Sequence, residues 1–246
     1  MDFKDFENQL KQGVKAFILC NPHNPIGRVW TETELAEIVA LCKQYNVLIL
    51  SDEIHADLVF APNKHIPIAK LDPSMTDNII TCMSPTKTFN LAGLQVSYAI
   101  VNDKQKREAL EKTFHKQGLH ILNTMGGITA LEAAYLEGKD WLVKLMEQLE
   151  ENMNYVINQF ANRKDVNVFK AEGTYLLWFD FRALNLSQEQ LKIFLEKEAK
   201  VGLNDGASFG EEGTGFMRMN IACPLELVKD GTNRIISALD RRDSNK

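Results

Sequence analysis

The sequence predicts an α/β protein whose first part is a mainly parallel sheet and whose last part is a smaller α+β domain. Between residues 15 and 83, continuous apolar runs alternate with amphipathic helix-like segments, which is typical of buried strands joined by crossovers. After about residue 163 the pattern changes to short strands and helices. A chain of 246 residues with 45% hydrophobic content can form one or two such domains.

Four strands are expected in the first part, at residues 15–20, 46–51, 78–83 and 95–101. A helix should begin after Thr31, whose hydroxyl and the carboxylate of Glu34 have the spacing of a capping box, and should end near Asn46. Its apolar stripe consists of Leu35, Ile38, Val39 and Cys42.

Three more helices are expected at residues 103–117, 124–137 and 140–161. The long third helix reads as a bridge between domains, with Leu142, Leu145, Leu149 and Met153 on its buried face. A capping box at Ser187 and Gln190 marks a helix of the second domain. We therefore expect domains at 1–140 and 163–246, connected by a bridging helix at 141–162.

Composition narrows the class of partner. The net charge is −5, and 28 basic and 33 acidic residues are mixed along the chain, so no basic stripe is available for nucleic acid and a small-molecule partner is expected. The four widely spaced cysteines suggest neither a disulfide framework nor a zinc site. No apolar run reaches the roughly 18 residues of a membrane span, and the charged N-terminus does not resemble a signal peptide. We expect a cytoplasmic protein.

Polar side chains follow three successive strands. Asn24 lies in the stiff NPHNPIG turn after the first strand, Asp52 follows the second, and Ser84 and Lys87 follow the third. Ligands of parallel sheets bind beyond these carboxyl ends. Taken singly, Asp52 could be a helix cap, Asn24 a turn residue and Lys87 a solvated surface charge.

Together these groups have a shared chemistry. A lysine amine forms a Schiff base with a carbonyl, and a carboxylate facing a pyridine nitrogen keeps it protonated, which is what pyridoxal phosphate (PLP) requires. Asn24 could donate a hydrogen bond to the phenolic oxygen of PLP, and the Ser84 hydroxyl could donate to its phosphate. The sequence therefore predicts a PLP site.

The segments NPHNPIGRVW, SDEIHADL and SPTKTFNLAGL resemble, in order, the cofactor segments of the fold-type I, class I/II aminotransferase superfamily. Together with EGTYLLWFDFRAL and LNDGASFGEEGTGFMRMNIACP, they are most similar to its MalY/PatB branch of cystathionine β-lyases, or C-S lyases. The resemblance covers essentially the whole chain. It implies the aspartate aminotransferase fold, with 1–140 as the remainder of the large PLP-binding domain, and a homodimer.

The resemblance also assigns roles. It implies that Lys87 bonds covalently to PLP, that Asp52 pairs with the pyridine nitrogen, that Asn24 contacts the phenolic oxygen and that Ser84 helps to hold the phosphate. Arg218 corresponds to the arginine that binds the substrate α-carboxylate, a role for which its planar guanidinium is suited. By itself, a strand arginine is more often part of a surface ion pair.

The chain departs from the superfamily pattern in three places. His55 occupies the position of a tyrosine beside the phenolic oxygen, and Gln95 that of a basic phosphate ligand; both fit the lyase branch but leave the phosphate charge unneutralised. Relatives also carry a large N-terminal part with a phosphate-binding glycine turn and a ring-stacking aromatic residue. The chain lacks this part, either as a fragment or as a truncated gene product, so we expect an incomplete large domain. If the missing part contributes central strands, the remaining sheet would expose unpaired edges.

The expected activity is β-elimination from cystathionine or cysteine-like amino acids, giving pyruvate, ammonia and a thiol. Transamination between amino acids and 2-oxo acids is the alternative, because Lys87, Asp52 and Asn24 would serve both reactions equally. A third possibility is a catalytically impaired remnant that keeps the fold. Only the resemblance to the lyase branch favours the first.

Overall fold

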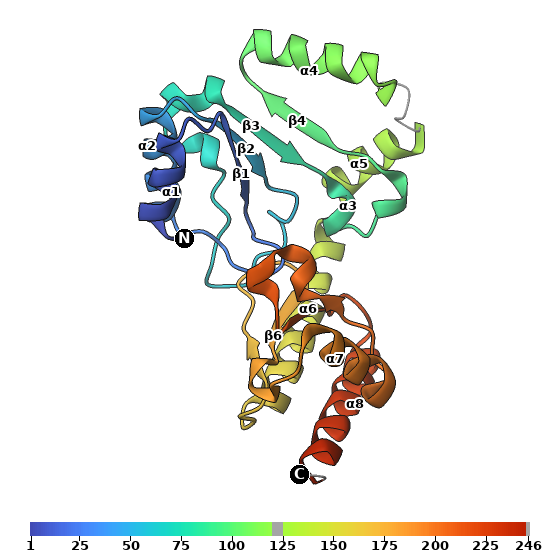
Figure 1. The fold of residues 1–246 in the computed structure, drawn as a ribbon. Coiled ribbons are helices and arrows are strands. Elements are labelled where there is room, and N and C mark those ends of the chain that lie inside the picture. The colour runs from blue at the N-terminus through green and yellow to red at the C-terminus, as the bar shows by residue number, and fades with distance from the viewer. Residues whose placement is uncertain (120–124, 245–246) are drawn as a thin grey trace. The chain divides into compact units, whose positions relative to one another are not determined.

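The structure, a computed structural model, describes residues 1–119 and 125–244. The chain divides into two compact units (Figure 1). The first contains Met1–His23 and Val29–Leu142, and the second contains Asn24–Arg28 and Val143–Lys246. The long predicted bridging helix thus begins in the first unit and continues in the second.

A four-stranded sheet with the order β1-β2-β3-β4 forms the centre of the first unit. Strands β1 to β3 are parallel, as predicted, whereas β4 runs antiparallel to β3. All four predicted strands and the predicted helices are present, although residue 124 lies outside the described residues. The elements of this unit are α1 (Phe3–Lys11), β1 (Ala16–Cys20), α2 (Glu32–Gln44), β2 (Leu48–Asp52), β3 (Ile79–Met83), α3 (Pro85–Thr88), β4 (Tyr98–Val101), α4 (Lys104–Lys116), α5 (Met125–Glu137) and the start of α6 (Lys139–Phe160).

Helix α2 begins where its capping box predicts. The Thr31 hydroxyl accepts the backbone N–H of Glu34 at 3.3 Å, and the Glu34 carboxylate accepts the backbone N–H of Thr31 at 2.9 Å. The predicted apolar stripe of the helix is buried against one face of the sheet, in the cluster that contains Leu19, Ile49 and Ile79. Helix α2 therefore covers this face and fixes the strands whose carboxyl ends carry the site.

Replacing Thr31 with alanine should lower the free energy of unfolding by about 0.5–2 kcal/mol, because the first turn of α2 loses its side-chain cap. Urea titration followed by circular dichroism measures the change. Thr113→Ala is the matched control, since Thr113 lies inside the exposed helix α4 and alanine is a better helix former there. Equal losses in both variants would contradict the capping role.

Helix α1 has no counterpart among the sequence-based predictions. The carboxylate of Asp2 caps it by accepting the N–H groups of Lys4 and Asp5. Phe6 and Leu10, one turn apart, are both buried, and the Phe6 ring lies 4.7 Å from the ring of Phe17 in β1. Most of the residues around Phe6 and Leu10 are charged or polar, so the sequence shows no extended apolar stripe that would predict this helix.

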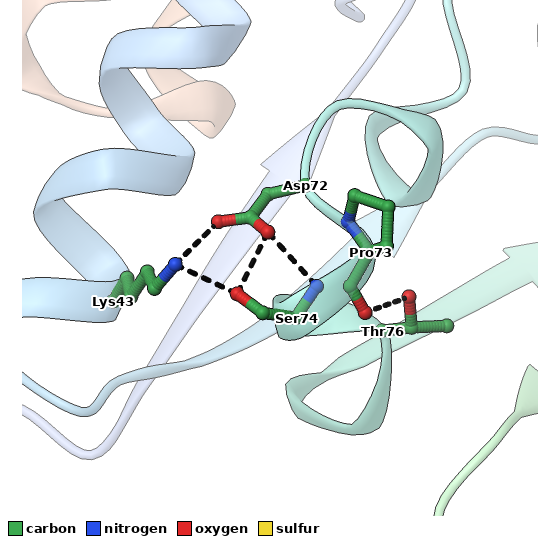
Figure 2. A network of polar contacts seen from close by, with 5 residues as sticks. All are labelled: Lys43, Asp72, Pro73, Ser74 and Thr76. Carbon is green, nitrogen blue, oxygen red and sulfur yellow. Dashed lines mark hydrogen bonds and ion pairs between the residues drawn. The ribbon is translucent and has the colours of Figure 1, made fainter.

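A polar network attaches α2 to the segment that precedes β3 (Figure 2). The Lys43 ammonium donates to Asp72 and to the Ser74 hydroxyl, both at 2.7 Å, while Asp72 caps the 3₁₀ turn Pro73–Asn78. Hydrogen bonds from Lys43 and Ser74 lower the pKa of Asp72 to about 2. The carboxylate therefore stays ionised at neutral pH, and the turn leads directly into β3.

The second unit contains an antiparallel sheet with the order β5-β6-β8-β7. Asn152 of α6 is fully buried, and its amide donates to the carbonyl oxygens of Ile221 at 2.8 Å and Cys223 at 2.9 Å, just after β8. No described helix in either unit has the length and apolar character to cross a bilayer. The remaining elements are β5 (Asn167–Phe169), β6 (Leu176–Asp180), α7 (Gln188–Ile193), a π-helical turn (Phe194–Ala199), β7 (Asn204–Asp205), β8 (Phe216–Asn220) and α8 (Leu225–Ser244).

Candidate active site

Asp52 and Lys87 come together in the first unit. Asp52 is the last residue of β2, and Lys87 lies in the short helix α3 that follows β3. Strands β2 and β3 are parallel, with Asp52 opposite Cys82, so their carboxyl ends meet at one edge of the sheet. Both side chains are half-buried. The backbone N–H of Ile54 donates to the Asp52 carboxylate at 3.2 Å.

Two opposing effects set the pKa of Asp52. Burial raises the pKa above its ordinary value of 3.8, with a small addition from the charge of Glu53. The Ile54 N–H and the positive charge of Lys87 act in the other direction. Asp52 and Lys87 are therefore near enough for their charges to interact. In the predicted site the carboxylate would face the pyridine nitrogen of PLP and the lysine its aldehyde carbon.

Ser84 caps α3. Its hydroxyl accepts the backbone N–H of Thr86 at 3.1 Å and donates to the carbonyl oxygen of Val96 at 2.7 Å. In this arrangement the hydroxyl proton is committed to Val96, and a phosphate oxygen could receive it only if the hydroxyl rotated. The role of Ser84 as a phosphate ligand stays a prediction.

The two positions that depart from the superfamily pattern have different environments. His55 is buried, three residues beyond the end of β2. Gln95 is exposed and has the left-handed backbone conformation, with φ of 49°. A neutral, exposed amide at position 95 adds no positive charge beside Ser84. The placement of His55 beside the phenolic oxygen stays a prediction.

Asp57 and Thr88 form a contact that the sequence reasoning did not single out. The Thr88 hydroxyl, which is fully buried, donates to the Asp57 carboxylate at 2.8 Å. Thr88 directly follows Lys87, and Asp57 lies five residues after Asp52, so the bond joins the loop after β2 to the helix after β3. It fixes the lysine-bearing turn relative to the aspartate-bearing loop.

Thr88→Val should lower the free energy of unfolding by about 1–3 kcal/mol, because it keeps the side-chain volume and leaves the Asp57 carboxylate without its donor. Urea titration gives the value. Thr88→Ser retains the hydroxyl and should recover most of the loss, apart from the missing methyl group. A Thr88→Val protein as stable as the wild type would show that this hydrogen bond does not hold the two loops together.

A second network fixes the end of β2. The buried carboxylate of Glu53 accepts the Ser51 hydroxyl at 2.9 Å and contacts Nε2 of His65 at 2.8 Å. The backbone N–H of Ile68 donates to the same carboxylate at 3.4 Å. The hydrogen bonds of the Glu53 side chain thus fix the backbone next to Asp52.

Asn24 and Arg218 are brought together in the second unit. The Arg218 guanidinium donates from Nη1 to the Asn24 side-chain oxygen at 2.7 Å and from Nη2 to that of Asn204 at 2.9 Å. It also lies over the Phe209 ring, 4.8 Å from its centroid. The contacts of Arg218 with described residues include no carboxylate. Among the residues that the structure describes, Arg218 therefore does not form the surface ion pair that is the ordinary explanation for a strand arginine.

The environment of Arg218 suits an anionic ligand. Burial lowers the pKa of its guanidinium, an effect that the nearby Tyr175 opposes, and Nε is buried with no hydrogen-bond partner among the described residues. Both hydrogen-bond partners of Arg218 are neutral amides. A half-buried cation without a neutralising charge can bind a carboxylate through its planar fork of donors.

Gly27 packs the Asn24 loop against Ala171, within the second unit. Its φ is +69°, and an added Cβ would lie 2.7 Å from the Cβ of Ala171, closer than atoms can pack. Its carbonyl oxygen accepts the backbone N–H groups of Glu172 and Gly173 at 2.8 and 2.9 Å. Only glycine fits this contact, which explains the residue two positions after Pro25 in NPHNPIG.

The chain belongs to the family described as aminotransferase class I and II, whose pattern matches residues 1–235. The strand-end lysine and aspartate and the two-unit fold agree with this assignment. The resemblance stated from the motifs and the predicted fold class are both confirmed.

The relatives include a cystathionine beta-lyase. The chain is 42% identical to cystathionine beta-lyase PatB of Bacillus subtilis over 242 residues, which is 97% of this chain and 62% of PatB. It is 34% identical to protein MalY of Escherichia coli, covering 93% of this chain and 58% of MalY. Among solved structures, PLP-containing cystalysin from Treponema denticola superposes with a TM-score of 0.92 at 32% identity, covering 98% of this chain and 61% of cystalysin.

A PLP-bound C-S lyase from Staphylococcus hominis also superposes, with a TM-score of 0.86 at 34% identity, covering 97% of this chain and 62% of the lyase. The chain therefore spans about three fifths of the length of the relatives that it matches.

Proposed function

We propose that the chain is the larger part of a PLP-dependent C-S β-lyase of the cystathionine β-lyase type. The observation that carries this proposal is the placement of two half-buried residues, Asp52 and Lys87, at the carboxyl ends of the neighbouring parallel strands β2 and β3. The similarity to the cystathionine beta-lyase PatB and to the C-S lyase of Staphylococcus hominis supports the lyase chemistry and, with it, cystathionine or a cysteine-like amino acid as substrate. A homodimer and a cytoplasmic location stay predictions.

The donor set fits the ring of PLP. A carboxylate, a lysine amine and an amide have the chemistry to contact its pyridine nitrogen, its aldehyde carbon and its phenolic oxygen. The residues predicted at the phosphate end of PLP fit less well. The Ser84 hydroxyl already donates its proton to the carbonyl oxygen of Val96, and Gln95 carries no positive charge. Phosphate neutralisation therefore requires groups beyond Ser84 and Gln95.

Each candidate residue has a separate role in the proposed β-elimination. When bound, PLP supplies an aldehyde for the amine and a ring that withdraws electrons from Cα. Arg218 binds the α-carboxylate of the substrate and orients its Cα–H bond. The Lys87 amine removes the Cα proton, and the charge of Asp52 holds a proton at the pyridine nitrogen. The Asn24 side-chain oxygen accepts a hydrogen bond from Arg218, and its Nδ2 amide is the group that could donate to the phenolic oxygen.

The net reaction breaks the Cβ–S bond, releases the sulfur as a thiol and, after addition of water, gives pyruvate and ammonia. Transamination would use the same first proton transfer but would consume a 2-oxo acid. The family contains aminotransferases by its description, so the two reactions have to be separated by experiment.

The test supplies the purified chain with PLP and L-cystathionine and omits any 2-oxo acid. We expect pyruvate and free thiol in equal amounts, measured with lactate dehydrogenase and with a thiol reagent. Turnover that occurs only after a 2-oxo acid is added would overturn the lyase assignment in favour of an aminotransferase. The absence of both turnover and a PLP absorption band would show the chain to be a remnant inactive on its own. PatB serves as the positive control.

A further inference from the structure

The strand beside the Arg218 guanidinium is very short. Strand β7 consists of Asn204 and Asp205 and lies at the edge of the second sheet, where it pairs with β8. Asn204 is opposite Arg218 in register, and its side-chain oxygen accepts from Nη2 of Arg218 at 2.9 Å. Two residues of an edge strand form few backbone hydrogen bonds, so side chains have to contribute to the position of this segment.

The segment after β7 carries the ring that lies under the guanidinium. The chain continues from β7 into the 3₁₀ turn Gly206–Phe209, and the centroid of the Phe209 ring is 4.8 Å from Cζ of Arg218. The Phe209 ring also packs edge to face against Trp178 of β6, which is opposite Arg218 in register. Residues 204–209 therefore supply two of the contacts that orient the guanidinium.

Asp205 fixes this segment from the other face of the sheet. Side chains alternate along a strand, so Asp205 points away from the face that carries Asn204 and Arg218. One oxygen of its carboxylate accepts the backbone N–H of Ala207 at 2.9 Å and thereby caps the 3₁₀ turn. The same oxygen accepts the Nε2 amide of Gln188 at 2.6 Å.

The side chain of Gln188 bridges β7 and β8. Its Oε1 accepts the backbone N–H of Gly215, directly before β8, at 2.6 Å, while its Nε2 donates to Asp205. This bridge needs an acceptor at one end and a donor at the other, which an amide provides and a carboxylate does not. Gln188 is the first residue of α7, whose start is fixed by the capping box of Ser187 and Gln190. The bridging amide is therefore itself held in place.

We propose that Gln188 and Asp205 are positioning residues for Arg218. They hold Asn204 and Phe209 against the guanidinium, so that its donors are oriented for a carboxylate before the substrate binds. Because their hydrogen bonds lie on the opposite face of the sheet, they act through residues 204–209 and not on the guanidinium directly. The inference rests on the role proposed for Arg218 in the lyase reaction.

The test follows the Nε–H group of Arg218 by NMR in the ¹⁵N-labelled chain, without PLP or substrate. Nε is buried, so the wild type should give a resolved signal with a high heteronuclear NOE; Arg218→Lys identifies the signal by removing it. Gln188→Met keeps the length of the side chain but removes both hydrogen bonds. It should lower the NOE and make hydrogen exchange of Nε–H about 5- to 10-fold faster, the effect of losing one hydrogen bond of ordinary strength.

Three variants complete the set. Asp205→Ala breaks the same hydrogen bond from its other end and should act as Gln188→Met does, so either variant decides the result if the other fails to fold. Asp205→Asn keeps an oxygen that can accept from Gln188, and its Arg218 signal should match that of the wild type. Asp230→Ala is the matched control, because it removes a carboxylate from an exposed pair with Arg234 on α8 and should leave the signal unchanged. Urea titration of each variant separates a local change from unfolding.

Steady-state kinetics with PLP and L-cystathionine give a second readout. Gln188→Met should raise KM about 10-fold and change kcat by less than about three-fold, because the carboxylate contact is weakened in the bound substrate and in the transition state alike. An Arg218 signal that stays as ordered in Gln188→Met and Asp205→Ala as in the wild type would overturn the proposal. The expected NMR response in a chain without turnover would support the positioning role while refuting the proposed lyase activity.

Discussion

Lys87→Ala should abolish pyruvate release from L-cystathionine, with a loss of at least about 10²–10⁴-fold from the missing proton transfer alone. The variant lacks both the amine that bonds to the cofactor and the base that acts on the Cα proton. Borohydride treatment in the presence of PLP should fix the cofactor on the peptide that contains Lys87 in the wild type, and this adduct should be missing from the variant. Absorption spectroscopy and peptide mass analysis give both results.

Lys104→Ala controls for the loss of a lysine. Lys104 is 80% exposed on α4, and its removal should change neither the adduct nor the activity. Lys87→Arg keeps a positive charge but cannot form the covalent bond, so it should be as inactive as Lys87→Ala. An adduct that forms equally well without Lys87 would refute its assignment as the cofactor lysine.

Asp52→Asn should lower turnover by about 10²–10³-fold, the usual effect of removing one preorganised electrostatic group. At the same time it should raise the free energy of unfolding at neutral pH. The pKa of Asp52 is raised by burial, so the folded state binds the proton more tightly than the unfolded state does. The free energy of unfolding of the wild type therefore falls as the pH rises from 3.8, the ordinary pKa of aspartate, through the raised pKa of Asp52. The asparagine amide does not ionise, so Asp52→Asn avoids this loss of stability.

The pH dependence of the wild type provides a separate check. Activity should fall as the pH drops through the raised pKa of Asp52, since the protonated carboxyl no longer favours a proton on the pyridine nitrogen. In urea titrations, the stability gain of Asp52→Asn over wild type should disappear below pH 3.8. Asp230→Asn, in an exposed pair with Arg234, is the control and should show no such gain. An Asp52→Asn protein that is both active and less stable would contradict the assignment.

The sequence predicted the sheet strands and the capped helix well, because their signals are local. A capping box and a run of apolar residues act within a few positions of the chain, as Thr31 and the β2 run show. The placement of Asp52 and Lys87 at neighbouring strand ends was also predictable, since parallel strands bring their carboxyl ends together. The direction of β4 was not, because a short apolar run has no polarity that the sequence reveals.

The supporting contacts of the site were beyond sequence reasoning for a different reason. Thr88 and Asp57 are 31 positions apart, and Arg218 and Asn24 are 194 apart, so only folding reveals that they meet. The motifs SDEIHADL and SPTKTFN contained Asp57 and Thr88 without indicating a partner for either. Helix α1 was missed because only Phe6 and Leu10 of its nine residues are buried.

The amide of Asn152 has a consequence for the position of the Arg218 guanidinium. It attaches the chain just beyond β8, the strand that carries Arg218, to a helix of 22 residues. The backbone that carries Arg218 is therefore anchored, while the Asn24 and Asn204 oxygens hold the guanidinium itself. Under the role proposed for Arg218, the substrate would meet donors that are already in place, so that little side-chain entropy is lost on binding.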